Sequence, residues 1–133
     1  MAKTAFYDSL LAQLTGLVEG EPDLIANLSN ISALLNLALS DLNWVGFYLL
    51  RSSDELVLGP FQGKPACIRI PVGKGVCGTA VATAQTQRVA DVHAFAGHIA
   101  CDGASNSEIV IPVRRGGEII GILDIDSPIF NRF

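Results

Sequence analysis

The first candidate for chemistry is Cys101, which lies in the segment from residue 91 to residue 107. This segment follows neither a helical nor a strand period, and irregular stretches of this length in small domains are usually functional or disordered. A cysteine in a loop is accessible, and a protonated His98 nearby could favour its nucleophilic thiolate form. A single His-x-x-Cys pair is nevertheless more often a surface histidine beside an idle thiol.

Cys67 and Cys77 have weaker claims on position alone. Cys67 falls in an expected strand, where a lone cysteine is usually a small core residue, and a role in catalysis would require Cys101 to fold over it. Cys77 begins an expected helix of small residues. The helix dipole could favour its thiolate, or the side chain could simply pack. The sequence leaves both alternatives open.

A zinc site is not predicted, although the three cysteines with His93 and His98 would supply enough ligand atoms. There is no Cys-x-x-Cys pair, and the spacings of 10 and 24 residues between the cysteines fit no compact zinc knuckle. The glycine-rich stretch 73–75 also lacks the spacing and the Lys-Ser/Thr ending of a phosphate-binding P-loop. We therefore expect neither a metal nor a bound cofactor.

Three carboxylates are expected near the cysteine loop. Asp124 and Asp126 alternate with apolar residues in an expected strand, so their side chains emerge on the same face. Glu108 begins the preceding strand, and a hairpin turn at 116–117 would make it a near cross-strand neighbour of Asp124, within a residue or two of register. Like charges this close are unfavourable unless a cation lies opposite them. The cluster is therefore either a solvent-facing sheet edge or a site for an ammonium group.

The elements that must position these residues follow the order helix, helix, three strands, helix, loop and two strands. Apolar residues recur first at helical spacing and then in runs rich in aromatic and branched residues, which are typical of strands. The expected helices cover 6–17, 24–39 and 76–84, and the expected strands cover 44–50, 56–58, 66–70, 108–113 and 119–125. This pattern predicts an α+β domain with a central antiparallel sheet, helices packed on one face and a long active-site loop over the sheet.

The composition limits the classes of function. A net charge of −4 and a pI near 4.9 exclude a nucleic-acid surface, which needs clustered Lys and Arg. No apolar run approaches the length that spans a bilayer, and the first residues lack the plan of a signal peptide. We therefore expect one cytoplasmic domain of 133 residues, with no membrane partner and with its thiols in a reducing compartment.

The sequence resembles the free methionine-R-sulfoxide reductases, which use a GAF-type domain. The likeness is carried by several segments in order along almost the whole chain, and the set is far more specific than any one of them. The segments read Asn-Trp-Val-Gly-Phe-Tyr at 43–48, Leu-Gly-Pro-Phe-Gln-Gly at 58–63, Gly-Val-Cys-Gly at 75–78, Asp-Val-His at 91–93, His-Ile-Ala-Cys-Asp at 98–102, Ser-Asn-Ser-Glu-Ile-Val at 105–110 and Leu-Asp-Ile-Asp-Ser at 123–127.

The resemblance implies a thiol-dependent reaction in the cytoplasm, linked to oxidative stress. Cys101 would attack the sulfoxide sulfur of free methionine sulfoxide, release methionine and become a sulfenic acid. Cys67 would condense with that sulfenic acid to give a Cys67–Cys101 disulfide. An external thiol reductant of the thioredoxin type would then reduce the disulfide. A homodimer is a candidate assembly.

The resemblance also assigns the residues around the substrate. Glu108, Asp124 and Asp126 match acids that hold the substrate and assist protonation at the sulfoxide oxygen. Trp44 matches an aromatic wall at the methyl-sulfur end, and Cys77 matches a third, auxiliary cysteine. Family members continue into a C-terminal helix, whereas this sequence ends at Phe133. The alternative class is a GAF domain that senses a small molecule without catalysis.

Overall fold

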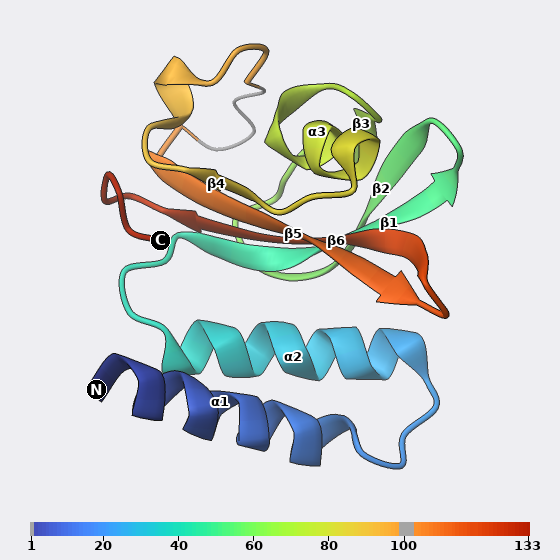
Figure 1. Cartoon of the computed structure of the whole chain (residues 1–133), viewed down its shortest axis with the longest axis vertical. Helices are drawn as coiled ribbons and strands as arrows, with labels where there is room; N and C mark the ends of the chain where they lie inside the picture. The colour runs from blue at the N-terminus through green and yellow to red at the C-terminus, as the bar shows by residue number, and fades with distance from the viewer. Residues whose placement is uncertain (1, 99–102) are drawn as a thin grey trace.

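The computed structural model describes residues 2–98 and 103–133 and forms one antiparallel sheet flanked by helices (Figure 1). The strand order is β3-β2-β1-β6-β5-β4. Along the chain the elements are α1 (Ala2–Val18), α2 (Leu24–Ala38), β1 (Trp44–Ser52), β2 (Glu55–Gly63), β3 (Arg69–Pro71), α3 (Gly75–Thr83), β4 (Gln87–Val89), the 3-10 turn η1 (Val92–Ala94), β5 (Ser107–Arg115) and β6 (Glu118–Ser127).

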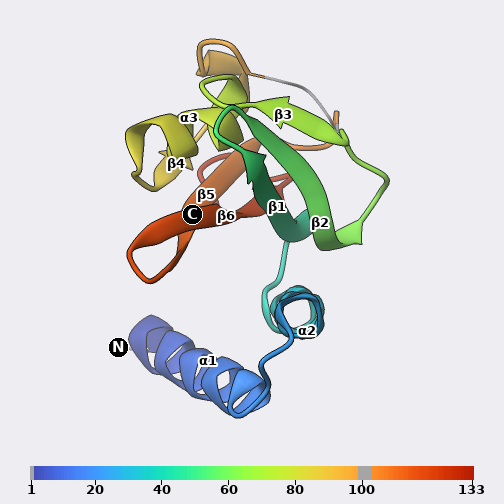
Figure 2. The same cartoon turned by 90° about the vertical axis from the view of Figure 1, so that its right-hand side faces the viewer.

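The sheet is covered on both faces. α1 and α2 lie together beneath it, whereas α3 and the segment around η1 lie on the opposite side (Figures 1 and 2). The side chains of strand β1 illustrate this arrangement, because they alternate between the two helical layers. Val45 packs with Leu10 of α1 and Leu35 of α2, whereas Trp44 and Tyr48 belong to the core beneath α3. Both faces of this central strand are therefore buried.

The predicted α+β domain with an antiparallel sheet is confirmed, and the positions of several elements differ from expectation. α3 packs on the face opposite α1 and α2, so the helices do not share one face. β3 begins only at Arg69, which leaves Cys67 outside the strand expected over 66–70. β4 and η1 were not predicted, and both fall in the stretch leading to the cysteine loop.

The two long helices differ in how firmly they are held. Asp23 caps α2 by accepting a hydrogen bond of 2.8 Å from the amide of Ala26, and α2 buries Leu28, Ser32 and Leu35. α1 buries Leu10 alone and contacts mainly α2. None of the helices in the described part of the chain combines the length and the apolar character needed to cross a membrane.

Gly46 of β1 provides a test of the packing on the α3 face. It lies opposite Phe61 of β2 and Asp124 of β6, and a Cβ atom there would overlap the Cβ of Phe61. We expect Gly46→Ala to lower the free energy of unfolding by about 1–3 kcal/mol, the usual cost of overpacking. Urea unfolding measures the change.

Gly16 of α1 serves as the matched control, because nothing lies within 4 Å of the position that its Cβ would take. Gly16→Ala removes a glycine from a helix interior and should raise stability by about 0.5–1 kcal/mol. Equal effects of the two substitutions would contradict the packing described here.

Candidate active site

Three buried carboxylates define the centre of the candidate site. In the ladder between β5 and β6, Glu108 lies opposite Asp126, and Val110 lies opposite Asp124. In the ladder between β1 and β6, Asp126 lies opposite Trp44 and Asp124 lies opposite Gly46. All three acids therefore project from the α3 face of the sheet.

The predicted grouping is confirmed. Glu108 was expected within a residue or two of the position opposite Asp124, and its direct partner is Asp126. The turn pairs Arg115 with Glu118, and an irregularity after Val113 shifts the rest of the ladder by a further residue. Because the total shift is even, the acids stay on the same face, and the expected cluster survives the shift.

The carboxylates are removed from solvent. Glu108 and Asp124 are each 6% exposed and Asp126 is 8% exposed, so the alternative of a solvent-facing sheet edge is wrong. Burial, followed by the charges of Asp126 and Glu108, raises the pKa of Asp124 well above its usual value. Its Oδ1 atom is buried without a hydrogen-bond partner among the described residues. Asp124 thus offers a ligand a carboxyl group whose neutral form is favoured, with one oxygen that bonds to none of the described residues.

Cys77 completes this buried group from the first turn of α3. It is a free thiol with 5% exposure, and burial, followed by the charges of Asp124 and Glu108, raises its pKa. The packing alternative is therefore favoured over a thiolate stabilised by the helix dipole. Ligand atoms of Cys77, Glu108 and Asp124 lie within 4.8 Å of one another. This is close enough to share a cation, and a ligand ammonium could use the same oxygens.

Two aromatic side chains of β1 form the wall beside the acids. The Trp44 ring is stacked on Phe61, with 5.1 Å between ring centroids, and on Tyr48, with 5.9 Å. The Trp44 indole donates a hydrogen bond of 3.1 Å to the carbonyl oxygen of Lys64. The Tyr48 hydroxyl donates one of 2.8 Å to the carbonyl oxygen of Cys67. The two hydrogen-bonded rings thus supply an apolar wall to the pocket that the three carboxylates also line.

The acids and aromatic rings line one pocket between the sheet, α3 and the segment that follows β2. His98 also lines it, so this histidine is not merely a surface residue. The lining residues are Trp44, Tyr48, Pro65, Ala66, Ile70, Lys74, Gly75, Val76, Cys77, His98, Ser105, Glu108, Asp124 and Asp126. Tyr48 and Ser105 were not predicted as site residues. For Tyr48 the signal existed, because it shares a strand face with Trp44.

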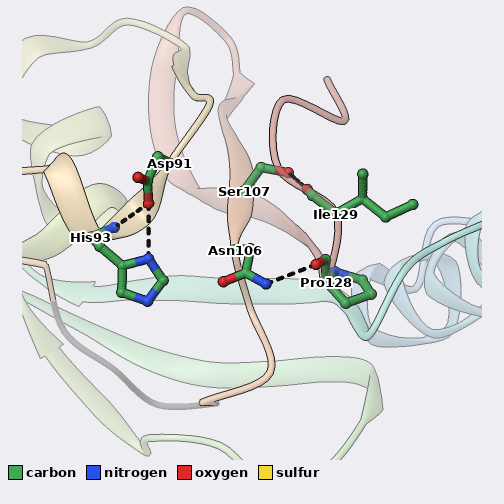
Figure 3. A network of polar contacts seen from close by, with 6 residues as sticks. All are labelled: Asp91, His93, Asn106, Ser107, Pro128 and Ile129. Carbon is green, nitrogen blue, oxygen red and sulfur yellow. Dashed lines mark hydrogen bonds and ion pairs between the residues drawn. The ribbon is translucent and has the colours of Figure 1, made fainter.

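Cys101 lies outside the described residues, and the structure shows instead how the two ends of its loop are held. At the C-terminal end, Ser105 accepts a hydrogen bond of 3.0 Å from the side chain of Asn43. Asn106 donates from its side-chain amide to the carbonyl of Pro128 at 2.8 Å, and Ser107 donates to that of Ile129 (Figure 3). Each residue of the Ser-Asn-Ser motif thus anchors the loop to a neighbouring segment.

The N-terminal end of the loop is fixed by its own cap. Asp91 accepts hydrogen bonds from the backbone amide of His93 at 3.0 Å and from its ring at 2.8 Å (Figure 3). The amide of Val92 donates to the carbonyl of Asn106 at 3.0 Å, which joins the two ends. The Asp91 contact engages the Nδ1 atom of His93.

Comparison with known proteins agrees with this geometry. A GAF domain model matches residues 23–132. The chain is 62% identical to the free methionine-R-sulfoxide reductase of Escherichia coli, over the whole of this chain and 80% of that protein. The structure of fRMsr of Staphylococcus aureus in complex with substrate has 61% identity and a TM-score of 0.90, over 96% of this chain and 82% of that one.

A second complex, of the free methionine-R-sulfoxide reductase of Neisseria meningitidis with its substrate, has 50% identity and a TM-score of 0.94, over 98% of this chain and 78% of that one. The chain belongs to the free methionine-R-sulfoxide reductase family. The resemblance predicted from the sequence motifs is thereby confirmed. The match to the GAF domain model covers the whole sheet, together with α2 and α3.

The raised pKa of Asp124 predicts how the stability of this family member depends on pH. In the native state Asp124 keeps its proton above its ordinary pKa of 3.8, whereas in the unfolded chain it loses the proton there. The native state then binds more protons than the unfolded state, so stability should fall as the pH rises through this window. Asp124→Asn, which is neutral and of the same shape, should flatten that fall.

Urea unfolding at a series of pH values above 3.8 measures the slope for each variant. Asp8→Asn, which removes an exposed carboxylate from α1, is the control and should keep the slope of the unsubstituted protein. Identical slopes for Asp124→Asn and Asp8→Asn would show that Asp124 is not a buried neutral acid.

Proposed function

We propose that this chain reduces free methionine-R-sulfoxide to methionine. The observation that carries the proposal is the gathering of Glu108, Asp124 and Asp126 in one buried pocket beneath the Trp44 ring. Carboxylates suit the ammonium group of a free amino acid, and an aromatic face suits the methyl-sulfur end. Membership in a family whose relatives are named for this reaction gives independent support.

The carboxylates also explain why the substrate would be a free amino acid. Binding an ammonium group offsets the repulsion among acids that are held together out of water. A methionine sulfoxide residue inside a peptide has no free ammonium and would bring the uncharged amide chain into a buried pocket. Such a substrate would leave the acids without their cation, and this loss of a charged partner discriminates strongly.

In the first chemical step, the thiolate of Cys101 attacks the sulfur of the sulfoxide. The sulfur–oxygen bond of the substrate breaks, the oxygen passes to Cys101 as a sulfenic acid, and methionine leaves. The oxygen gains a proton in this step, which a neutral carboxylic acid can donate. Glu108 and Asp124 lie side by side in the pocket, and the buried, protonated Asp124 is suited to supply or relay that proton.

In the second step, the thiol of Cys67 attacks the Cys101 sulfenic acid. A disulfide between the two sulfurs forms and one water molecule is released. A thioredoxin-type dithiol then reduces the disulfide by thiol–disulfide exchange and becomes a disulfide itself. Cys67 lies in the short segment between β2 and β3, directly after the pocket residues Pro65 and Ala66, which supports this role.

The proposal predicts the behaviour of three variants. Cys101→Ser should lose turnover by at least about a thousandfold, because the nucleophile is gone. Asp126→Asn should raise KM for the free amino acid, since it removes one of the negative charges around the ammonium. Cys77→Ser, which keeps a small side chain at a position without a chemical step, should retain most of the turnover.

The assay measures methionine released from each epimer of the free sulfoxide and from N-acetylmethionine sulfoxide, with dithiothreitol or thioredoxin as reductant. Turnover should be confined to the free R epimer. Folded protein that binds the R epimer without releasing methionine would instead establish the sensing GAF domain. Thermal unfolding with and without the ligand detects that binding.

A further inference from the structure

The segment that carries Cys67 is held to the sheet by hydrogen bonds from side chains. Residues 64–68 form no helix or strand, and they pass over the aromatic rings of β1. The Trp44 indole bonds the carbonyl of Lys64 at one end, and the Tyr48 hydroxyl bonds the carbonyl of Cys67 near the other. The carbonyl of Ile68 is bound by the amide of Leu58 at 2.8 Å.

We propose that Tyr48 is a positioning residue for the second step, because its hydroxyl fixes the backbone of Cys67 where the thiol can meet the Cys101 sulfenic acid. The inference rests on the proposed function, in which Cys67 is the resolving cysteine. Tyr48 acts through Cys67 and takes no proton or oxygen itself. The step is condensation of a thiol with a sulfenic acid, with loss of one water molecule.

The ring of Tyr48 is enclosed by its neighbours. The ring is 2% exposed, it is stacked on Trp44, and it is packed in the core beneath α3. Burial is the main cause that raises the pKa of Tyr48, and the nearby thiol and carboxylates raise it further. The phenol therefore remains a hydrogen-bond donor throughout the physiological range. A rigid ring carrying a permanent donor is suited to fixing a carbonyl that no helix or strand holds.

Gly63, at the end of β2, is a residue that the close approach of this segment to the rings requires. Its φ of +140° is rarely adopted by other residues, and a Cβ atom there would approach within 2.5 Å of the Trp44 ring. Glycine therefore lets the chain leave β2 directly over the indole. The following residues then come within reach of both aromatic donors.

Disulfide formation is sensitive to such positioning. The two Cα atoms must come within roughly 4.4–6.8 Å, with the Cβ atoms directed toward each other. A Cys67 backbone free to shift would spend less time in this arrangement, and the sulfenic acid would survive longer. The first step, at the sulfur of the substrate, makes no use of Cys67 and would not share this dependence.

Tyr48→Phe tests the inference, because it removes the hydroxyl and keeps the ring. The reduced protein is mixed with excess free methionine-R-sulfoxide without reductant, and two rates are followed in the same sample. One is the release of methionine, and the other is the formation of disulfide, counted by alkylation and mass spectrometry. The ratio of disulfide rate to methionine rate should fall about three- to tenfold, as expected for one lost hydrogen bond.

Dimedone-trapped Cys101 sulfenic acid should accumulate correspondingly in Tyr48→Phe. Tyr7→Phe is the matched control, because Tyr7 lies exposed on α1, and it should leave the ratio unchanged. In a Cys67→Ser background no Cys67–Cys101 disulfide can form, and the yield of trapped sulfenic acid should be the same with and without Tyr48→Phe.

The outcomes separate this inference from the proposed function. Absence of any methionine release by the unsubstituted protein would overturn the reductase itself and the role of Tyr48 with it. Methionine release with an unchanged ratio in Tyr48→Phe would overturn only the positioning role. A lower yield of sulfenic acid in the Cys67→Ser background would assign Tyr48 to the first step instead, which also contradicts the proposal.

Discussion

The site depends on the burial of three carboxylates on one face of the sheet. Glu108, Asp124 and Asp126 would repel one another as anions in a medium of low dielectric constant, and each would be costly to desolvate. The raised pKa of Asp124, caused by burial and by the neighbouring charges of Asp126 and Glu108, favours the neutral form of this acid and so reduces the repulsion. In the proposed function, the same arrangement makes the pocket selective, since a ligand with an ammonium group relieves the repulsion that remains.

This burial is possible only because β1 and β6 are central strands with helices on both sides. α1 and α2 cover one face with ordinary apolar packing, so the opposite face is free to hold polar groups beneath α3. Gly46 contributes by having no side chain where Phe61 of β2 packs closely against β1. α3 contributes Cys77, a small thiol that closes the pocket without competing as a thiolate.

The sequence predicted the architecture and the residue set better than it predicted their arrangement. Alternation of Asp124 and Asp126 with apolar residues determines a shared face whatever the register, so the acid cluster was recoverable. Their exact pairing with Glu108 depends on the turn that pairs Arg115 with Glu118 and on an irregularity after Val113, for which the sequence carries no visible signal. The continuous apolar run of β1 did indicate burial on both faces, and it should have placed a helix on each side.

Local sequence patterns gave the wrong secondary structure where tertiary contacts determine the path of the backbone. Cys67 stands among residues with the character of a strand, yet the strand begins at Arg69, because the preceding segment is bonded to aromatic side chains instead of to a ladder. The Ser-Asn-Ser motif shows the converse. Its small polar residues read as ordinary loop, but each one makes a bond to a distant segment. Side-chain bonds to distant backbone leave no periodicity in the sequence.

These two kinds of anchor together explain how a small domain can support a reaction between two cysteines. The two ends of the Cys101 loop are joined by the bond between Val92 and Asn106, and its C-terminal end is bonded to the segment after β6 and to Asn43. The segment of Cys67 is held from β1. The proposed chemistry requires two thiols to meet over a pocket and then to be separated again by a reductant. Anchors on both sides of the Cys101 loop and within the Cys67 segment suit the proposed cycle.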